Sequence, residues 1–350
     1  MKKQIALLLA GVMAFSATAC GVGVEDMAEA STELNVYMWP DYISEDVIQQ
    51  FEEENNCTVN LSYMNSTADA VEKLKTGCGE EFDLVMVQNT DIEALADGDD
   101  LEKFKHDSLP NTSTLKDYCW ISKSYGIPYL MQYLYVVYDS KTCPVEITGY
   151  GDLLNPALKG KIASVDGARN LFGVALTAVG SNHSSTEEAD LEKAYHWLTK
   201  YHENVAEYRE DAAQALLDGT VSVALTFDRD AAQAMAKKKS IRIAAFKKHK
   251  VQALVDMFVI PAEAEHQDLA EAFLNYICDP EVMAENLKKV PYSCPNEVAE
   301  VMAPEKYKAA PERNFDYQKN VFLLRNVEDA HSLYEQYYDM LKNPPAEEME

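Results

Sequence analysis

Apolar residues at the start of the folded region switch between the spacing of a strand and that of a helix. Residues 34–39 alternate in the pattern of a strand, and residues 47–51 then place apolar side chains on one face of a helix. Ser44 precedes this helix and supplies the hydroxyl oxygen that commonly caps a helix start. The order repeats, with further strands predicted near 59–63 and 83–87 and a helix between them. Strands that alternate with helices predict parallel pairing in an α/β sheet.

The same alternation resumes in the second half of the chain. Strands are predicted at 161–165, 220–227 and 256–260, and apolar residues at helical spacing follow the first of them near 171–179. One extended segment, Ile127 to Tyr138, joins the two series. Two α/β units joined in this way predict two lobes with a cleft between them. In open α/β sheets a ligand binds beyond the carboxyl ends of the strands.

Residues 1–19 have the three parts of an export signal: lysines, an apolar core at 5–15 and small residues at the end. The apolar core is too short to span a bilayer. Cys20 resembles the lipobox cysteine of bacterial lipoproteins, which is diacylated, although Ala17 stands where these motifs usually carry leucine. We therefore expect a lipid anchor at Cys20 and a tether over 20–32. The alternative is an ordinary signal peptide without lipidation.

Composition favours an ordinary globular α/β protein of more than one lobe. Apolar residues make up 47% of 350 residues, with 14 Gly and 13 Pro. The net charge of −27 argues against binding to nucleic acid or to anionic lipid. It permits a cationic ligand without requiring one, because surface acids also serve solubility.

Six cysteines remain once Cys20 is assigned to the lipid: Cys57, Cys78, Cys119, Cys143, Cys278 and Cys294. In an oxidising compartment they could form up to three disulfides, and free buried thiols are equally open. No Cys-x-x-Cys pair or His-rich cluster accompanies them, so no metal site is expected.

Six segments, taken together and in this order, resemble the extracellular solute-binding proteins of ABC importers, specifically the spermidine/putrescine-binding group. They are Val36–Ile43, Phe82–Val85, Tyr125–Tyr129, Gly151–Ile162, Val290–Asn296 and Leu333–Lys342. The fourth, with Asp-Leu-x-x-Pro-x-x-Lys-Gly, is the most specific. The resemblance extends over residues 33 to 342.

This resemblance implies a bilobal periplasmic-binding-protein-like fold of type II, with two α/β lobes, a hinge and an interlobe cleft. The implied first lobe is 33–138 plus 256–291, the second is 139–255 plus 292–343, and 344–350 is a tail. Such proteins capture a solute by hinge closure and deliver it to permease subunits. We expect a monomer that is anchored by lipid and that binds neither nucleic acid nor a cofactor.

A polyamine carries an ammonium at each end of a methylene chain, so its site needs carboxylates and aromatic faces. The resemblance implies that Trp39, Tyr42, Asp256 and Tyr292 contact the ligand, with Asp41 beside the first pair. A functional role for Asp256 is also favoured independently of the resemblance, because burying an acid within an apolar strand costs free energy unless the acid is paired.

The other candidate ligand residues lie where the chain departs from the family. They are Asn89, Thr90, Asp166, Asn170, Phe227 and Asp228. Asn170 falls where the family has an acid, and Phe227 falls where it has tryptophan. Asp166 either substitutes for the missing acid from a neighbouring position or caps the following helix. The site is thus less acidic at one end, which leaves a diamine or another small cation as the solute.

Other functions remain open at this stage. One alternative keeps the family and changes the solute to ferric iron, a sugar or an anion. Tyr337-Tyr338 is the candidate for iron, and Arg169 is the candidate for an anion. An exported enzyme is much less favoured, because the Gly-x-Ser-x-Gly, His-Glu-x-x-His and Gly-x-Gly-x-x-Gly motifs are missing from the sequence. We therefore assign no catalytic residue. A purely structural lipoprotein would not need a cleft lined by aromatic residues and an acid.

Overall fold

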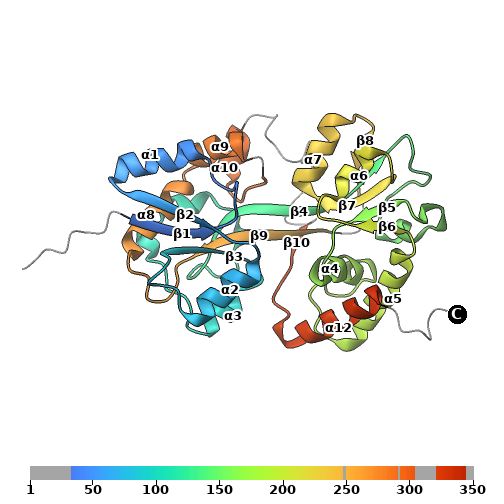
Figure 1. Cartoon of the computed structure of the whole chain (residues 1–350), viewed down its shortest axis with the longest axis horizontal. Coiled ribbons are helices and arrows are strands. Elements are labelled where there is room, and N and C mark those ends of the chain that lie inside the picture. The colour runs from blue at the N-terminus through green and yellow to red at the C-terminus, as the bar shows by residue number, and fades with distance from the viewer. Residues whose placement is uncertain (1–32, 247–249, 291, 304–320, 344–350) are drawn as a thin grey trace, which may run out of the picture. The chain divides into compact units, whose positions relative to one another are not determined.

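The computed structural model describes residues 33–246, 250–290, 292–303 and 321–343 (Figure 1). The expected signal, the lipidated Cys20, the tether and the tail 344–350 lie outside these residues, so they stay predictions. Within the described ranges, no helix combines the length and the apolar character needed to cross a bilayer.

The strands are β1 (Glu33–Met38), β2 (Thr58–Tyr63), β3 (Leu84–Gln88), β4 (Ile127–Asp139), β5 (Ile162–Ser164), β6 (Val205–Tyr208), β7 (Val223–Phe227), β8 (Ile241–Ile243), β9 (Val251–Val259) and β10 (Val321–Leu323). In the described part of the chain they form one sheet, in the order β2-β1-β3-β9-β4-β7-β5-β6. β10 pairs with β9, and β8 pairs with β4.

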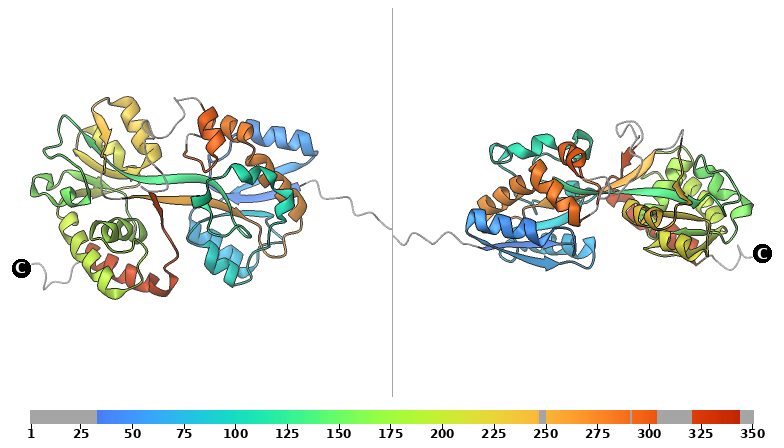
Figure 2. Two further views of the ribbon diagram at one scale, coloured as in Figure 1. Left: turned by 180° about the vertical axis from the view of Figure 1, so that it is seen from behind. Right: turned by 90° about the horizontal axis from the view of Figure 1, so that it is seen from above.

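Pairing is parallel towards both ends of the sheet and antiparallel in its middle. β1 is parallel to β2 and β3, and β5 is parallel to β6 and β7, as the alternation predicts. β9, however, is antiparallel to both β3 and β4, and β4 is antiparallel to β7. The expectation of parallel pairing was therefore wrong for the middle, because β4 carries the chain into the second half and β9 brings it back. Figure 2 shows these two strands passing between the two groups of helices.

The helices are α1 (Glu45–Asn55), α2 (Thr67–Thr76), α3 (Ile92–Asp97), α4 (Ala168–Ala178), α5 (Glu188–His202), α6 (Ala212–Asp218), α7 (Asp228–Lys237), α8 (Gln267–Ile277), α9 (Pro280–Lys289), α10 (Glu297–Met302) and α12 (His331–Lys342). The predicted cap of α1 is confirmed, since the Ser44 hydroxyl accepts a hydrogen bond from the Val47 amide at 3.3 Å. The first turn of α1 carries two acids, which favour the positive end of the helix dipole.

Two large apolar clusters fill the described structure. The first extends from α1, α8 and α9 across β4 and β9 to α6 and α7, and it includes the buried rings of Phe51 and Phe258. The second lies around α4, α5 and α12, with Phe172 and Tyr334 at its centre. Because the first cluster includes residues of β4 and β9, these two strands are packed against apolar side chains in both halves of the structure.

All six cysteines after Cys20 lie in the described residues, and all are free thiols. Cys119, Cys278 and Cys294 are buried. Of the two alternatives that the sequence left open, the structure has the free thiols.

Candidate functional site

Asp256 is a fully buried carboxyl in the middle of β9. Its Oδ2 accepts hydrogen bonds from the Tyr42 hydroxyl at 3.2 Å and from Gln132 Nε2, on β4, at 3.1 Å. Gln88, the last residue of β3, is its partner across the strand pair. Asp256 therefore lies beside the carboxyl end of β3, and a ligand is expected at the carboxyl ends of the strands in this class of sheet.

The other oxygen of Asp256, Oδ1, is buried and has no hydrogen-bond partner among the described residues. Burial raises the pKa of this carboxyl to about 6, although hydrogen bonds from Gln132 and Tyr42 act in the opposite direction. The negative charge of Asp91 raises it further. A buried carboxylate without a cationic partner is unfavourable, so a bound cation would stabilise its ionised form.

Two tyrosine rings lie beside this acid. The ring centroids of Tyr42 and Tyr292 are 4.7 Å apart and the planes are tilted by 48°. The backbone carbonyl of Tyr42 accepts hydrogen bonds from the Tyr129 hydroxyl and from Asn286 Nδ2, at 2.9 and 3.4 Å, which fixes this turn after β1. The site thus has a carboxyl and two aromatic faces, the groups that recognise an ammonium ion.

Trp39 and Asp41 come from the same turn but differ from Tyr42. Trp39 is half-buried and packs on the first apolar cluster. Asp41 is exposed and has a left-handed backbone with φ of 59°. The structure gives neither side chain a hydrogen bond to Asp256, so their contact with a ligand stays a prediction.

Arg229 is a site residue that the sequence reasoning missed. Its guanidinium carbon lies 4.9 Å from the centroid of the Tyr292 ring, and its Nη1 donates to the Tyr292 hydroxyl. Its neighbour Asp228 is fully buried and accepts a hydrogen bond from the Ser293 hydroxyl at 2.7 Å. The start of α7 therefore contacts residues 292–293, and a positive charge of the protein itself already lies on one of the two rings.

Gln132 was also missed. It is the one polar side chain within the apolar and aromatic run of β4 that precedes Asp139, so the argument that selected Asp256 could have selected it. Arg229 could have been suggested only by its position beside Phe227 and Asp228.

The candidates at the ends of β3 and β7 have mainly structural contacts. Asn89 is buried, accepts a hydrogen bond from the Val255 amide at 2.9 Å and donates to the Leu324 carbonyl at 2.6 Å. Its side chain therefore joins backbone segments. Phe227 packs against a small apolar cluster that contains Leu254, two residues before Asp256 on the same strand.

Asp166 and Asn170 lie at the start of α4. Asp166 accepts from Lys342 Nζ at 2.9 Å and from the Tyr338 hydroxyl, and these hydrogen bonds lower its pKa although burial opposes them. It is not the cap of α4, because Gly167 takes that position. Asn170 accepts from Gln252 Nε2, on β9, at 3.2 Å. Asp166 thus already has a cationic partner, unlike Asp256.

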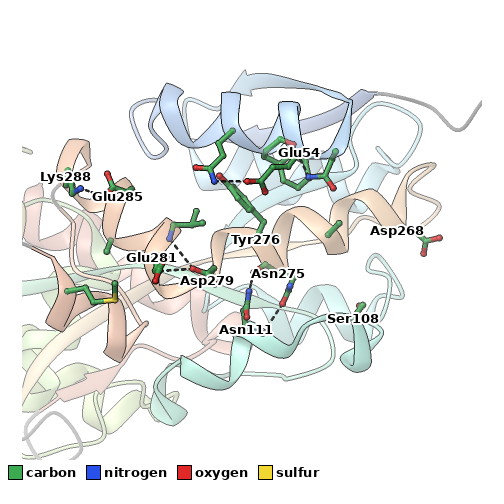
Figure 3. Close-up of a pocket in the computed structure, with 17 residues that line it drawn as sticks. Glu54, Ser108, Asn111, Asp268, Asn275, Tyr276, Asp279, Glu281, Glu285 and Lys288 are labelled. Carbon is green, nitrogen blue, oxygen red and sulfur yellow. Dashed lines mark hydrogen bonds and ion pairs between the residues drawn. The ribbon is translucent and has the colours of Figure 1, made fainter. Parts of the chain in front are cut away.

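One pocket of the described residues lies away from this site. It has a volume of about 1050 Å³ between α1, α8 and α9, and Figure 3 shows Glu54, Asp279, Glu281 and Glu285 around it. None of the predicted ligand residues lines this pocket. This pocket is therefore separate from the site around Asp256.

A second pocket, of about 580 Å³, lies at the carboxyl end of β3. Gln88, Thr90 and Asp91 line one side of it, and Arg169 and Arg325 line the other. Thr90 is thus the one predicted ligand residue in this pocket. In the part of the chain that the structure describes, no three His, Cys, Asp or Glu side chains are grouped to hold a metal ion.

The chain is similar to known proteins over nearly its whole length. The spermidine/putrescine-binding periplasmic protein 1 of Haemophilus influenzae is 27% identical over 359 residues, covering 98% of this chain and 99% of the relative. The spermidine/putrescine-binding periplasmic protein of Escherichia coli is 27% identical over 349 residues, covering 96% and 97%.

A solved structure confirms the predicted type II fold. The spermidine/putrescine ABC transporter substrate-binding protein PotD of Streptococcus pneumoniae superposes with a TM-score of 0.79 at 24% identity, covering 89% of this chain and 99% of that one. Residues 46–314 match the sequence model that describes bacterial extracellular solute-binding proteins. Since this match spans well over half of the chain, the chain belongs to the family of bacterial extracellular solute-binding proteins.

Proposed function

We propose that this protein is the extracytoplasmic solute-binding component of an ABC importer and that it captures a small, polyamine-like cation. The observation that carries the proposal is the fully buried Asp256, whose Oδ1 has no hydrogen-bond partner in the described residues and which lies beside Tyr42. The names of the two curated relatives, which refer to spermidine and putrescine, support the same class of solute.

In this proposal, one ammonium of the solute donates a hydrogen bond to Asp256. A hydrogen bond to a charged group contributes about 1.5–3 kcal/mol. The Tyr42 and Tyr292 rings add cation–π attraction of about 0.5–2 kcal/mol each. The two central strands, β4 and β9, connect the halves and would carry the hinge by which the cleft closes over the solute.

Delivery involves no chemistry in this proposal: the closed protein presents its solute to permease subunits. Residues 1–19 direct export, and acylated Cys20 with the tether over 20–32 holds a monomer at the membrane. Trp39 and Asp41 complete the binding site from the turn that carries Tyr42. Asn89, Asn170, Phe227 and Asp228 support the site through the contacts described above.

The test is the substitution Asp256→Asn, with putrescine and spermidine binding measured by titration calorimetry. Asn keeps the size of the side chain and removes the negative charge, so a buried ammonium loses its partner. Breaking such a pair costs about 3–5 kcal/mol, which corresponds to roughly a 100-fold or larger increase in Kd.

The matched control is Asp107→Asn, which removes an equal charge from an exposed position outside the predicted binding site. Its effect should be less than about threefold, as for other exposed charges. Equal putrescine affinity of the parent and Asp256→Asn would contradict the proposal.

A further inference from the structure

The pocket of about 580 Å³ at the end of β3 differs in charge from the Asp256 site. Its lining comes from α2, α3 and the end of β3 on one side, and from α4, residues 325–327 and α12 on the other. In Figure 1, α2 and α3 belong to one half of the structure, and α4 and α12 belong to the other half. The pocket therefore lies where the two halves face each other.

Arg169 is the best-fixed cation in this pocket. It follows the Gly167 cap at the start of α4, and its guanidinium carbon lies 5.0 Å from the centroid of the Tyr334 ring. Its Nη2 donates to the Arg325 carbonyl at 3.0 Å and to the Ser184 hydroxyl at 3.3 Å. Its Nη1 is buried and has no hydrogen-bond partner among the described residues. The guanidinium thus keeps hydrogen-bonding capacity that the contacts within the protein leave unused.

Burial lowers the pKa of Arg169, which indicates that its positive charge is poorly solvated. An arginine nevertheless stays charged at neutral pH. A positive charge in this condition is stabilised by an anion, for the same reason that the buried Asp256 carboxylate is stabilised by a cation.

Arg325 is the second cation of this pocket. Its backbone makes hydrogen bonds to two other residues, and its side chain is exposed. Its amide donates to the Ser184 hydroxyl at 2.9 Å, and its carbonyl accepts from Arg169. Its guanidinium lines the pocket without a hydrogen bond or an ion pair to the described residues. Arg325 and Arg169 are therefore joined through the backbone, and both reach the same pocket.

The charged residues that line the pocket have an excess of positive charge. Lys75, Arg169 and Arg325 carry three positive charges, and Asp91 is the one carboxylate among the lining residues. If the charge of Asp91 cancels that of one cation, a net charge of two positive units remains among the lining residues. This excess occurs in a chain of net charge −27, so the overall composition does not explain it. Gln88, Thr90 and Ser332 add neutral hydrogen-bonding side chains.

We propose that this pocket binds a small oxyanion, either a carboxylate or a phosphate group, with Arg169 and Arg325 as its ligands. Arginine suits this role because its planar fork of N–H donors matches both groups. A carboxylate or phosphate here would receive hydrogen bonds that the two guanidinium groups do not use within the protein.

The pocket adjoins the Asp256 site. Gln88 lines it and is the partner of Asp256 in the pairing of β3 with β9, and Asp91 is near enough to affect the pKa of Asp256. The inference rests on the proposed function and specifies its solute further. The oxyanion is either the acidic end of a solute whose amino end meets Asp256, or a free anion that binds beside an amine.

The experiment compares three probes on the purified full-length protein by titration calorimetry: 5-aminopentanoate, putrescine and inorganic phosphate. The first two have similar lengths, but 5-aminopentanoate has a carboxylate in place of one ammonium. The variants are Arg325→Gln, Arg169→Gln and Asp256→Asn. The control is Arg242→Gln, an exposed arginine of β8 that does not line the pocket. Thermal melts establish that each variant folds, and Arg325→Gln alone decides the result if Arg169→Gln does not fold.

If the anion belongs to the solute, 5-aminopentanoate binds more tightly than putrescine, and Arg325→Gln raises its Kd at least tenfold while sparing putrescine. If the anion is free, phosphate binds, and its binding falls by the same factor in Arg325→Gln. Either result supports the pocket. Failure of both anions to bind, or unchanged Kd values in both arginine variants, would overturn it.

The outcome for the proposed function is read separately. Putrescine binding that depends on Asp256, without any effect of the arginines, leaves the proposed function in place and overturns the oxyanion pocket. Phosphate binding that depends on Arg325, together with no binding of putrescine or 5-aminopentanoate, would support the oxyanion pocket and contradict the proposed function.

Discussion

Asp166 and Asp256 are both candidates for meeting an ammonium ion, but the structure gives them different surroundings. Asp166 has Lys342 at 2.9 Å and the Tyr338 hydroxyl, and its pKa is lowered. Among the described residues, Asp256 has only the neutral donors of Gln132 and Tyr42, and burial raises its pKa to about 6. An acid that is already paired gains little from a second cation, whereas a buried acid with neutral partners gains much. We therefore expect Asp256 to recognise the ligand and Asp166 to have a structural role.

The first way to sharpen this comparison is the pH dependence of putrescine binding. The pKa of Asp256 is about 6 in the ligand-free protein, and the ammonium binds the ionised form. Affinity should be constant above about pH 7 and should fall by up to about tenfold per pH unit below pH 6, because the carboxyl must then release a proton. Calorimetry at several pH values measures this. A parent profile as flat as that of Asp256→Asn would remove this carboxyl from recognition.

A smaller effect is expected for Arg229→Gln. The Arg229 guanidinium lies on Tyr292 and repels an ammonium that approaches the two rings. Removing about 1 kcal/mol of repulsion should tighten putrescine binding by roughly 3–10-fold. Arg242→Gln is the control for the same change of charge. Weaker binding by Arg229→Gln would instead mean that its contact with Tyr292 helps to close the halves.

The smallest effect on binding is expected for Asp166→Asn. Its charge is already balanced by Lys342, so putrescine Kd should change by less than about twofold. The substitution should instead affect stability. The folded pKa of Asp166 is lowered, so its contribution is present above its ordinary pKa of about 3.9 and is lost as pH falls through the folded value.

Thermal melts of parent and Asp166→Asn at neutral pH and near pH 3 measure this contribution, and the difference in melting temperature between the two proteins should be smaller at the lower pH. A large loss of putrescine affinity in Asp166→Asn would contradict the comparison, because it would give Asp166 the role assigned here to Asp256.

Local patterns predicted most of the elements. The Ser44 cap, the helix after it and the long strand from Ile127 appear where the sequence indicates them. The pattern did not predict that the middle of the sheet is antiparallel, because strand direction depends on how the chain returns through β9. It also failed to indicate the short strand β6, which has only four residues.

The site was predictable only where a residue conflicts with its local surroundings. Asp256 is an acid in an apolar strand, so its cost could be recognised from the sequence alone. Arg229 and Arg325 stand among ordinary polar neighbours, and nothing in their local sequence indicates the ring of Tyr292 or the side chain of Arg169.

The sequence by itself determined the alternation of helices and strands, the type II fold through its resemblance, and the isolated acid in β9. These features depend on apolar spacing, capping and burial within a few residues. Only the tertiary structure decided which charges are balanced, because Lys342 reaches Asp166 and Tyr292 meets Arg229 from distant parts of the chain. Electrostatic interactions depend on distance in space and on solvation, and the order of residues specifies neither.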